Sequence, residues 1–183
     1  MKTRIVLTLG IGLLLLACGS QKEIISEADR AKLEGMVNAK TMYLDAEWAN
    51  PLATRSINSV ASAGLLPPGS NPNRIDIIGT ASYIKIHKDS VSAILPYYGE
   101  RQFGSTYNQK EVGIQFEGVP DAFEMEYDAK KQAYTFEFDI VNEFGEGFNV
   151  SGTLFPNFRT NFYINSTERM TIGYWGSVKD LEE

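Results

Sequence analysis

Side chains that could do catalytic chemistry are sparse in this sequence. It has one histidine, His87, and one cysteine, Cys18. A Ser-His-Asp triad would have to use His87, which lies on the polar face of an expected strand. The sequence also has no Gly-x-Ser-x-Gly elbow for a nucleophilic serine. A transition-metal site needs several convergent His or Cys ligands, and these are lacking. We therefore expect no enzyme activity and no cofactor.

Acidic side chains are abundant, 23 in all. Asp121, Glu124, Glu126 and Asp128 alternate along one segment, so they would line one face of a strand. Side chains two residues apart on a strand are separated by about 7 Å, so a calcium ion would need further oxygens from loops. We expect a solvated strand face here. No spacing singles out a carboxylate pair for glycoside cleavage.

Aromatic side chains near arginines form the third chemical pattern. One group follows residue 95 and the other lies in the last expected hairpin. At a barrel mouth, the rings could stack on a small apolar or amphipathic ligand while an arginine binds its anionic end. The alternative is that the rings plug the barrel and the arginines pair with structural carboxylates. The candidate ligand-binding residues are Tyr97, Tyr98, Arg101, Tyr107, Arg169, Tyr174 and Trp175.

Residues 1–17 have the three parts of a secretory signal peptide. Lys2 and Arg4 give a positive start, and the apolar stretch at 5–16 is too short for a spanning helix of roughly 20 residues. Leu15-Leu16-Ala17-Cys18 then resembles the bacterial lipobox, in which the cysteine is alkylated by a diacylglyceryl group and the chain is cut just before it. The resemblance predicts a lipoprotein whose mature chain begins at lipidated Cys18.

The anchor would be acyl chains of the palmitate type. Each buried methylene contributes about 0.8 kcal/mol, so several chains on one residue hold stably. Gly19 stands where an Asp would signal inner-membrane retention, so we expect the outer membrane, with the leaflet left open. Residues 18–25 read as a tether, in which Gln21-Lys22-Glu23 is either a surface-export tag or a solvated spacer. Asp89-Ser90-Val91 resembles an O-glycosylation site of exported proteins.

The charge balance excludes one class of partner. Loss of Lys2 and Arg4 with the signal peptide takes the 17 basic side chains to 15 against 23 acidic ones, a net charge of −8. Such an acidic domain has no electrostatic footprint for nucleic acid. It would also be repelled by anionic lipid headgroups, so the membrane contact expected is the lipid on Cys18.

The elements that must position these side chains begin with a short helix. Ser26 is an N-cap candidate, and the acids at 27 and 29 favour the first turn of a helix. From Met42 the hydrophobic period changes to two and gives a strand that Pro51 ends. Residues 51–73 read as a long loop, and residues 75–87 read as one strand that bends at Gly79.

From there on, short alternating segments and turns follow one another to Val178. They make about nine strands, the pattern of an antiparallel meander. Such a ribbon has two exposed edges, which antiparallel proteins remove by closing into a barrel. We predict an all-β, lipocalin-like barrel with a short N-terminal helix, as a single domain over 26–183. A two-sheet sandwich is the alternative.

Two stretches resemble a known family. They are Leu95-Pro96-Tyr97-Tyr98-Gly99 after a strand, and Arg169-x-x-Ile172-x-Tyr174-x-Gly176 at the end of the chain. With the lipobox they are similar to domain-of-unknown-function family 4251, whose members are small lipoproteins. The resemblance covers roughly residues 30–180 and implies a lipocalin-like barrel, without an activity or catalytic residues.

Two functions are therefore expected ahead of the rest. The first is a non-enzymatic module on the outer membrane that binds a small apolar or amphipathic ligand in its barrel. The second is a structural or interaction protein of the cell envelope, with a partner at the acidic outer face or at the 51–73 loop. A hydrolase is the least expected of the three.

Overall fold

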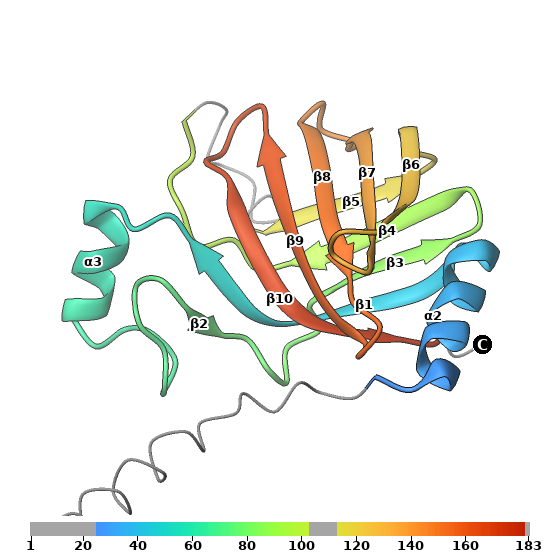
Figure 1. Cartoon of the computed structure of the whole chain (residues 1–183). Coiled ribbons are helices and arrows are strands. Elements are labelled where there is room, and N and C mark those ends of the chain that lie inside the picture. The colour runs from blue at the N-terminus through green and yellow to red at the C-terminus, as the bar shows by residue number, and fades with distance from the viewer. Residues whose placement is uncertain (1–24, 103–112, 182–183) are drawn as a thin grey trace, which may run out of the picture.

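The computed structural model describes residues 25–102 and 113–181, which form a curled antiparallel sheet and two helices (Figure 1). The all-β class and the N-terminal helix are confirmed. The helices are α2 (Glu27–Ala39) and α3 (Arg55–Ser62). The strands are β1 (Thr41–Pro51), β2 (Ile75–Asp76), β3 (Tyr83–His87), β4 (Ser90–Leu95), β5 (Ile114–Gly118), β6 (Asp121–Asp128), β7 (Ala133–Val141), β8 (Gly147–Leu154), β9 (Arg159–Ser166) and β10 (Ile172–Lys179).

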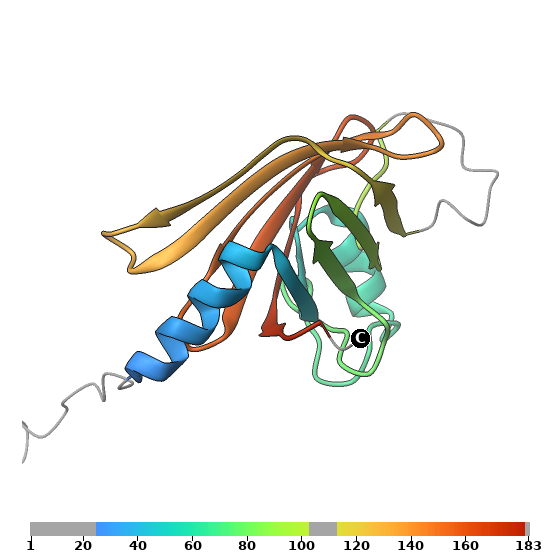
Figure 2. The ribbon, with the colours of Figure 1, turned by 90° about the vertical axis from the view of Figure 1, so that its right-hand side faces the viewer.

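The strands follow an up-and-down order that stays open at one seam. The order across the sheet is β5-β4-β3-β1-β10-β9-β8-β7-β6, with the short β2 beside β1. The first strand thus pairs with the last, as in a closed barrel. However, β5 and β6 are consecutive in the chain and do not pair with each other. The expected meander is confirmed, and the sheet curls into a half-barrel whose seam lies between β5 and β6 (Figure 2).

The backbone explains why the seam stays open. Only Val119 and Pro120 separate β5 from β6, and Pro120 has no N–H to donate to a ladder. Gly118 has a φ of 155° and Ala122 a φ of 50°. The register of β6 against β7 shifts between Asp121 and Glu124, which marks a β-bulge at the start of β6. A bulge bends its strand and increases the local twist, so β6 diverges from β5.

Alternate side chains of the long strands turn toward one shared interior, as the period of two predicts. The rings of Phe116 and Phe138 meet edge to face with centroids 6.1 Å apart, and Phe148 lies 5.6 Å from Phe116. The interior is therefore packed by side chains from both halves of the curled sheet. Its buried members include Met42, Leu44, Ile84, Ile86, Leu95, Ile114, Phe136, Ile140, Val150, Phe162, Ile164, Ile172 and Tyr174.

Helix α2 lies under the overhanging β6–β7 hairpin (Figure 2). Ser26 caps its start, because the Ser26 hydroxyl accepts the N–H of Asp29 at 3.0 Å. Lys40, in the left-handed region, ends it. Arg30 donates to the Gln132 side chain in the β6–β7 turn at 3.4 Å. The face that α2 buries consists of Leu33, Met36 and Val37.

Two sequence expectations are wrong. The segment 51–73 contains α3, which sequence analysis missed because its serines and asparagine are poor helix formers. Its support is tertiary: Ile57 is buried, and the Ser56 hydroxyl donates to Glu100 at 2.7 Å. The expected single strand at 75–87 is two strands, β2 and β3, separated by a turn with Gly79 at a φ of 84°.

Among the described residues, no helix combines the length and apolar character needed to cross a membrane.

Candidate functional site

Two arginines of the predicted mouth lie in a buried ionic cluster at one end of the half-barrel. The Arg169 Nε donates to Glu146 at 2.8 Å, and both residues are buried, at 6% and 2% exposure. Arg101 pairs with Glu168, and its guanidinium lies 3.9 Å from Glu146. The Ser166 hydroxyl also donates to Glu146. The cluster is balanced in charge. This arrangement corresponds to the alternative stated from the sequence, in which the arginines pair with structural carboxylates.

Two tyrosines pack around this cluster. The ring of Tyr97 lies 5.2 Å from the Arg169 guanidinium, and its hydroxyl donates to the Met170 carbonyl at 3.1 Å. Burial raises the pKa of Tyr97 above its ordinary value. Tyr174 is fully buried and donates to the Pro96 carbonyl at 2.7 Å. Burial also raises the pKa of Tyr174, well above its ordinary value.

The remaining predicted residues are dispersed. Tyr98 is half-buried against the core. Trp175 lies on the other side of the sheet, where its ring meets Tyr163 at 5.6 Å. Tyr107 lies outside the described residues, as do the signal peptide and Cys18. The structure thus brings Tyr97, Arg101, Arg169 and Tyr174 together at one end, and ligand binding there stays a prediction.

The side chains weighed for catalysis or metal binding lie apart from this end. His87 is exposed at the end of β3, on the strand face opposite to the buried Ile84 and Ile86. The acids of β6 point outward along an exposed strand. In residues 25–102 and 113–181, no group of three or more His, Cys, Asp or Glu side chains is arranged to hold a metal ion.

A large hollow lies outside the sheet, between α2, the β8–β9 turn and the outward faces of β10, β1 and β3. It has a volume of about 980 Å³. The rings of Tyr43 and Tyr83 stack in it with centroids 4.9 Å apart. Strand register places Lys179 and Lys85 on either side of Tyr43. We call this hollow the α2 groove; it is lined by Lys32, Met36, Tyr43, Tyr83, Lys85, Phe158, Ser177, Val178, Lys179, Asp180 and Leu181.

Comparison with known proteins now adds one finding. The sequence profile described as a domain of unknown function, DUF4251, matches residues 25–178. The chain belongs to the DUF4251 family. No curated protein and no solved structure matches it. The resemblance seen in the sequence is therefore confirmed at the level of the family.

Charge in the α2 groove is unlike that of the DUF4251 domain as a whole. Lys32 pairs with Asp180 at 2.6 Å, and Lys179 pairs with Asp45 at 2.5 Å. Lys85 has no carboxylate within ion-pair distance in the described part of the chain. Of the three lysines that line the groove, Lys85 is therefore the one without an ion pair to a described carboxylate, and it stands beside two stacked phenols.

The phenol groups are potential donors in the same place. Burial raises the pKa of Tyr43 above its ordinary value, and the Asp45 carboxylate and Tyr83 act in the same direction. The Tyr43 hydroxyl therefore keeps its proton at neutral pH. Two apolar side chains complete the lining, Met36 from α2 and Val178 from β10. Both are almost fully buried. The DUF4251 domain thus presents cationic, donor and apolar groups in one hollow.

Sequence analysis did not identify this groove in the DUF4251 domain. Tyr43, Tyr83 and Lys85 are visible as outward positions of alternating strands, but alternation does not reveal which strands are neighbours. Their proximity depends on the register of β1 with β3 and with β10. Glu146, the centre of the ionic cluster, was missed as well, because a carboxylate in a Gly-Glu-Gly turn reads as solvated.

Proposed function

We propose that the DUF4251 domain is an outer-membrane lipoprotein that binds a small amphipathic anion in the α2 groove. The observation that carries the proposal is the stacked pair of Tyr43 and Tyr83 beside Lys85, a cation without an ion-pair partner in the described residues. The lipid on Cys18 would keep the domain at the membrane, and no catalytic step is involved.

The groove has the size and chemistry of a small-molecule site. Ligand sites in proteins occupy about 300–1,000 Å³ and combine apolar walls with a few placed polar groups. At about 980 Å³ the α2 groove lies at the upper end of this range. In the proposed pose, a planar part of the ligand stacks on Tyr83, its anionic group contacts Lys85, and its apolar part lies against Met36 and Phe158.

The groove is a better-supported place for the ligand than the barrel interior. The inward side chains pack against one another, and α2 adds Leu33 and Val37 to the same core. The aromatic and arginine residues at the other end are engaged with each other, with Tyr174 fully buried. A ligand inside the half-barrel would have to displace these contacts, whereas a ligand in the α2 groove displaces only water.

Anchoring rests on the lipobox and on the position of the first helix. Eight residues, 19–26, separate the modified cysteine from the start of α2, and a chain of that length reaches at most about 30 Å. The first turn of α2 is thus held near the membrane. The α2 groove, which contains Lys32 from the same helix, then lies at the membrane-proximal end.

Ligand binding is tested with anilinonaphthalene sulfonate, an aromatic amphiphilic anion that becomes fluorescent on binding. We expect saturable binding that Lys85→Gln weakens about fivefold, because a partly exposed charge pair contributes up to about 1 kcal/mol. Tyr83→Ala should weaken it further, since stacking is lost. Matched controls are Lys88→Gln, in the exposed β3–β4 turn, and Tyr163→Ala, in the other outward aromatic pair. Equal binding by all four variants would refute the site.

Anchoring is tested separately in cells. The wild-type chain should incorporate a palmitate label and fractionate with outer membranes. The Cys18→Ser variant should lose both properties because the acylated thiol is absent. Retention of the label by this variant, or its unchanged membrane fraction, would contradict the lipid anchor and leave the groove experiment independent of it.

A further inference from the structure

The open seam of the half-barrel leaves β6 with a free edge. Among the strands of residues 25–102 and 113–181, β6 pairs only with β7 and stands at the end of the strand order. None of its eight residues is fully buried, whereas β7 and β8 alternate buried and exposed positions. A free edge presents unpaired N–H and C=O groups that can accept another strand. The neighbouring β5 does not take this place, although it is only two residues away in the chain.

The inward side of β6 is also incompletely covered. Phe123 and Met125 pack on the core but stay partly exposed, and Tyr127 is 52% exposed. The Phe123 ring lies 5.6 Å from the ring of the buried Phe138. The apolar inner surface therefore continues up to the edge, where α2 lies beneath the hairpin and the Lys40 ammonium stands 4.9 Å from the Phe123 ring centre, while the outer end of the row at Tyr127 stays exposed. An additional strand would extend the sheet and cover this apolar row.

The outward side of the same edge is strongly acidic. Glu124 lies directly opposite Glu137, and Asp121 lies opposite Asp139. Like charges directly opposite each other destabilise a strand pair, so this arrangement is unfavourable in the isolated domain. The amide of Asn149 donates to both β7 carboxylates, which spreads their charge only in part.

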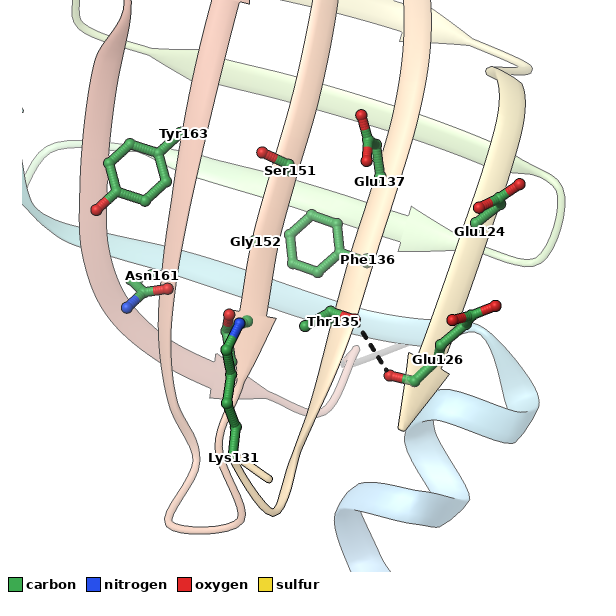
Figure 3. Close-up of a pocket in the computed structure, with 11 residues that line it drawn as sticks. Glu124, Glu126, Lys131, Thr135, Phe136, Glu137, Ser151, Gly152, Asn161 and Tyr163 are labelled. Carbon is green, nitrogen blue, oxygen red and sulfur yellow. Dashed lines mark hydrogen bonds between the residues drawn. The ribbon is translucent and has the colours of Figure 1, made fainter. Parts of the chain in front are cut away.

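A hollow of about 370 Å³ accompanies this edge on the outward face. Figure 3 shows Glu124, Glu126 and Glu137 around it, with Lys131 at one side. Its other polar lining includes Asn161 and Tyr163 from β9. Long cationic side chains of a strand placed along β6 would reach these carboxylates.

Pairing of β6 with the β6 of a second copy does not fit this edge. In an antiparallel pair, directly opposed residues point to the same side of the sheet. Two β6 strands in register with their apolar rows together would therefore oppose Glu124 and Glu126 of one copy to the same acids of the other. Such pairs of like charges are unfavourable. The charge pattern instead favours a strand with basic residues on its outward side.

We propose that the β6 edge binds an extended basic segment of a partner protein by strand addition, with lysine or arginine at alternate positions and apolar residues between them. The backbone of the segment pairs with β6. Its apolar row covers Phe123, Met125 and Tyr127, and its basic row faces Glu124, Glu126 and Glu137. The seam between β5 and β6 is the place in the fold where such a strand is accommodated.

The test uses a synthetic peptide of about ten residues, the upper end of usual strand lengths and enough to span β6, in which lysine alternates with valine and threonine. We expect binding to the whole mature domain that weakens on going from about 50 to about 300 mM salt, because exposed charges are screened. Glu124→Gln with Glu126→Gln should weaken it about five- to tenfold. The matched control, Glu117→Gln with Glu143→Gln on exposed acids near β5, should leave binding unchanged.

A second probe separates strand addition from charge attraction. The same peptide with N-methyl groups on alternate backbone nitrogens keeps every charge but cannot donate along one edge, so it should not bind. Hydrogen exchange should slow at the β6 amides and stay unchanged in β5 when the unmodified peptide binds. Equal binding of the methylated peptide, absence of binding, or protection at β5 instead of β6 would each overturn the proposal.

Discussion

The ion pair of Arg169 and Glu146 provides a sharp test of how the end of the half-barrel that carries the ionic cluster is held together. Both side chains are almost completely buried, at 6% and 2% exposure, and the Arg169 Nε lies 2.8 Å from Glu146. At an effective dielectric of about 20, two unit charges about 4 Å apart attract by about 4 kcal/mol, against about 1 kcal/mol in water. Removal of one partner also leaves the other charge buried without it.

We expect Glu146→Leu or Arg169→Met alone to lower the free energy of unfolding by about 3–5 kcal/mol. For a domain of this size, that corresponds to a fall in Tm on the order of 10 °C. The double variant should lose less than the sum of the two, with a coupling of about 2–3 kcal/mol, because neither charge is then left buried without the other. Arg101 and Glu168 remain paired in all three variants.

The assay is urea unfolding followed by tryptophan fluorescence, with the exposed pair of Arg159 and Glu47 as control. These two side chains approach to 2.9 Å, yet Arg159 is 61% exposed, so their coupling should be below about 1 kcal/mol. Additive losses at Arg169 and Glu146, or a coupling as small as that of the control pair, would refute the reasoning that burial makes the cluster strong.

Three further predictions concern stability. Tyr174→Phe should cost about 1 kcal/mol at neutral pH, since the Pro96 carbonyl loses its donor. Because burial raises the pKa of Tyr174, its phenol ionises first in the unfolded chain. The stability of the wild-type protein should therefore fall as the pH rises above 10.0. In alkaline melting curves, the stability of the Tyr174→Phe variant should fall less steeply. Gly176→Ala should disrupt the β1–β10 pairing and greatly reduce the soluble yield, because a Cβ there would lie 1.8 Å from the Asp45 carbonyl oxygen. Gly35→Ala, where a Cβ meets nothing within 4 Å, should instead raise stability by about 0.5–1 kcal/mol in urea unfolding, and a loss there would contradict the helical position of Gly35.

Local patterns explain the parts of the fold that could be predicted. The alternation in Tyr134, Phe136, Phe138 and Ile140 requires only that one strand face be buried, and the structure follows it. Ser26 likewise identifies a helix start from neighbours in the chain. The prediction failed at α3, whose residues have little helical preference of their own, so its formation depends on contacts with distant residues such as Glu100.

The candidate sites divide along the same line. Sequence analysis grouped Arg101 with Arg169 because both stand near aromatic residues, and their segments do meet. It did not foresee Glu146 as their common partner or the stacking of Tyr43 on Tyr83. These contacts join residues that are remote along the chain, and side-chain periodicity carries no information on which strands become neighbours.

By itself, the sequence determined the class of the fold, the inward and outward faces of its strands, the first helix and the family. Only the tertiary structure decided that β1 pairs with β10, that β5 and β6 part, and that a groove with Lys85 opens beside α2. The physical reason is that burial of alternate side chains is a local requirement that each segment meets alone. Register, seam and groove depend instead on twist, bulges and packing between segments that the chain brings together only on folding.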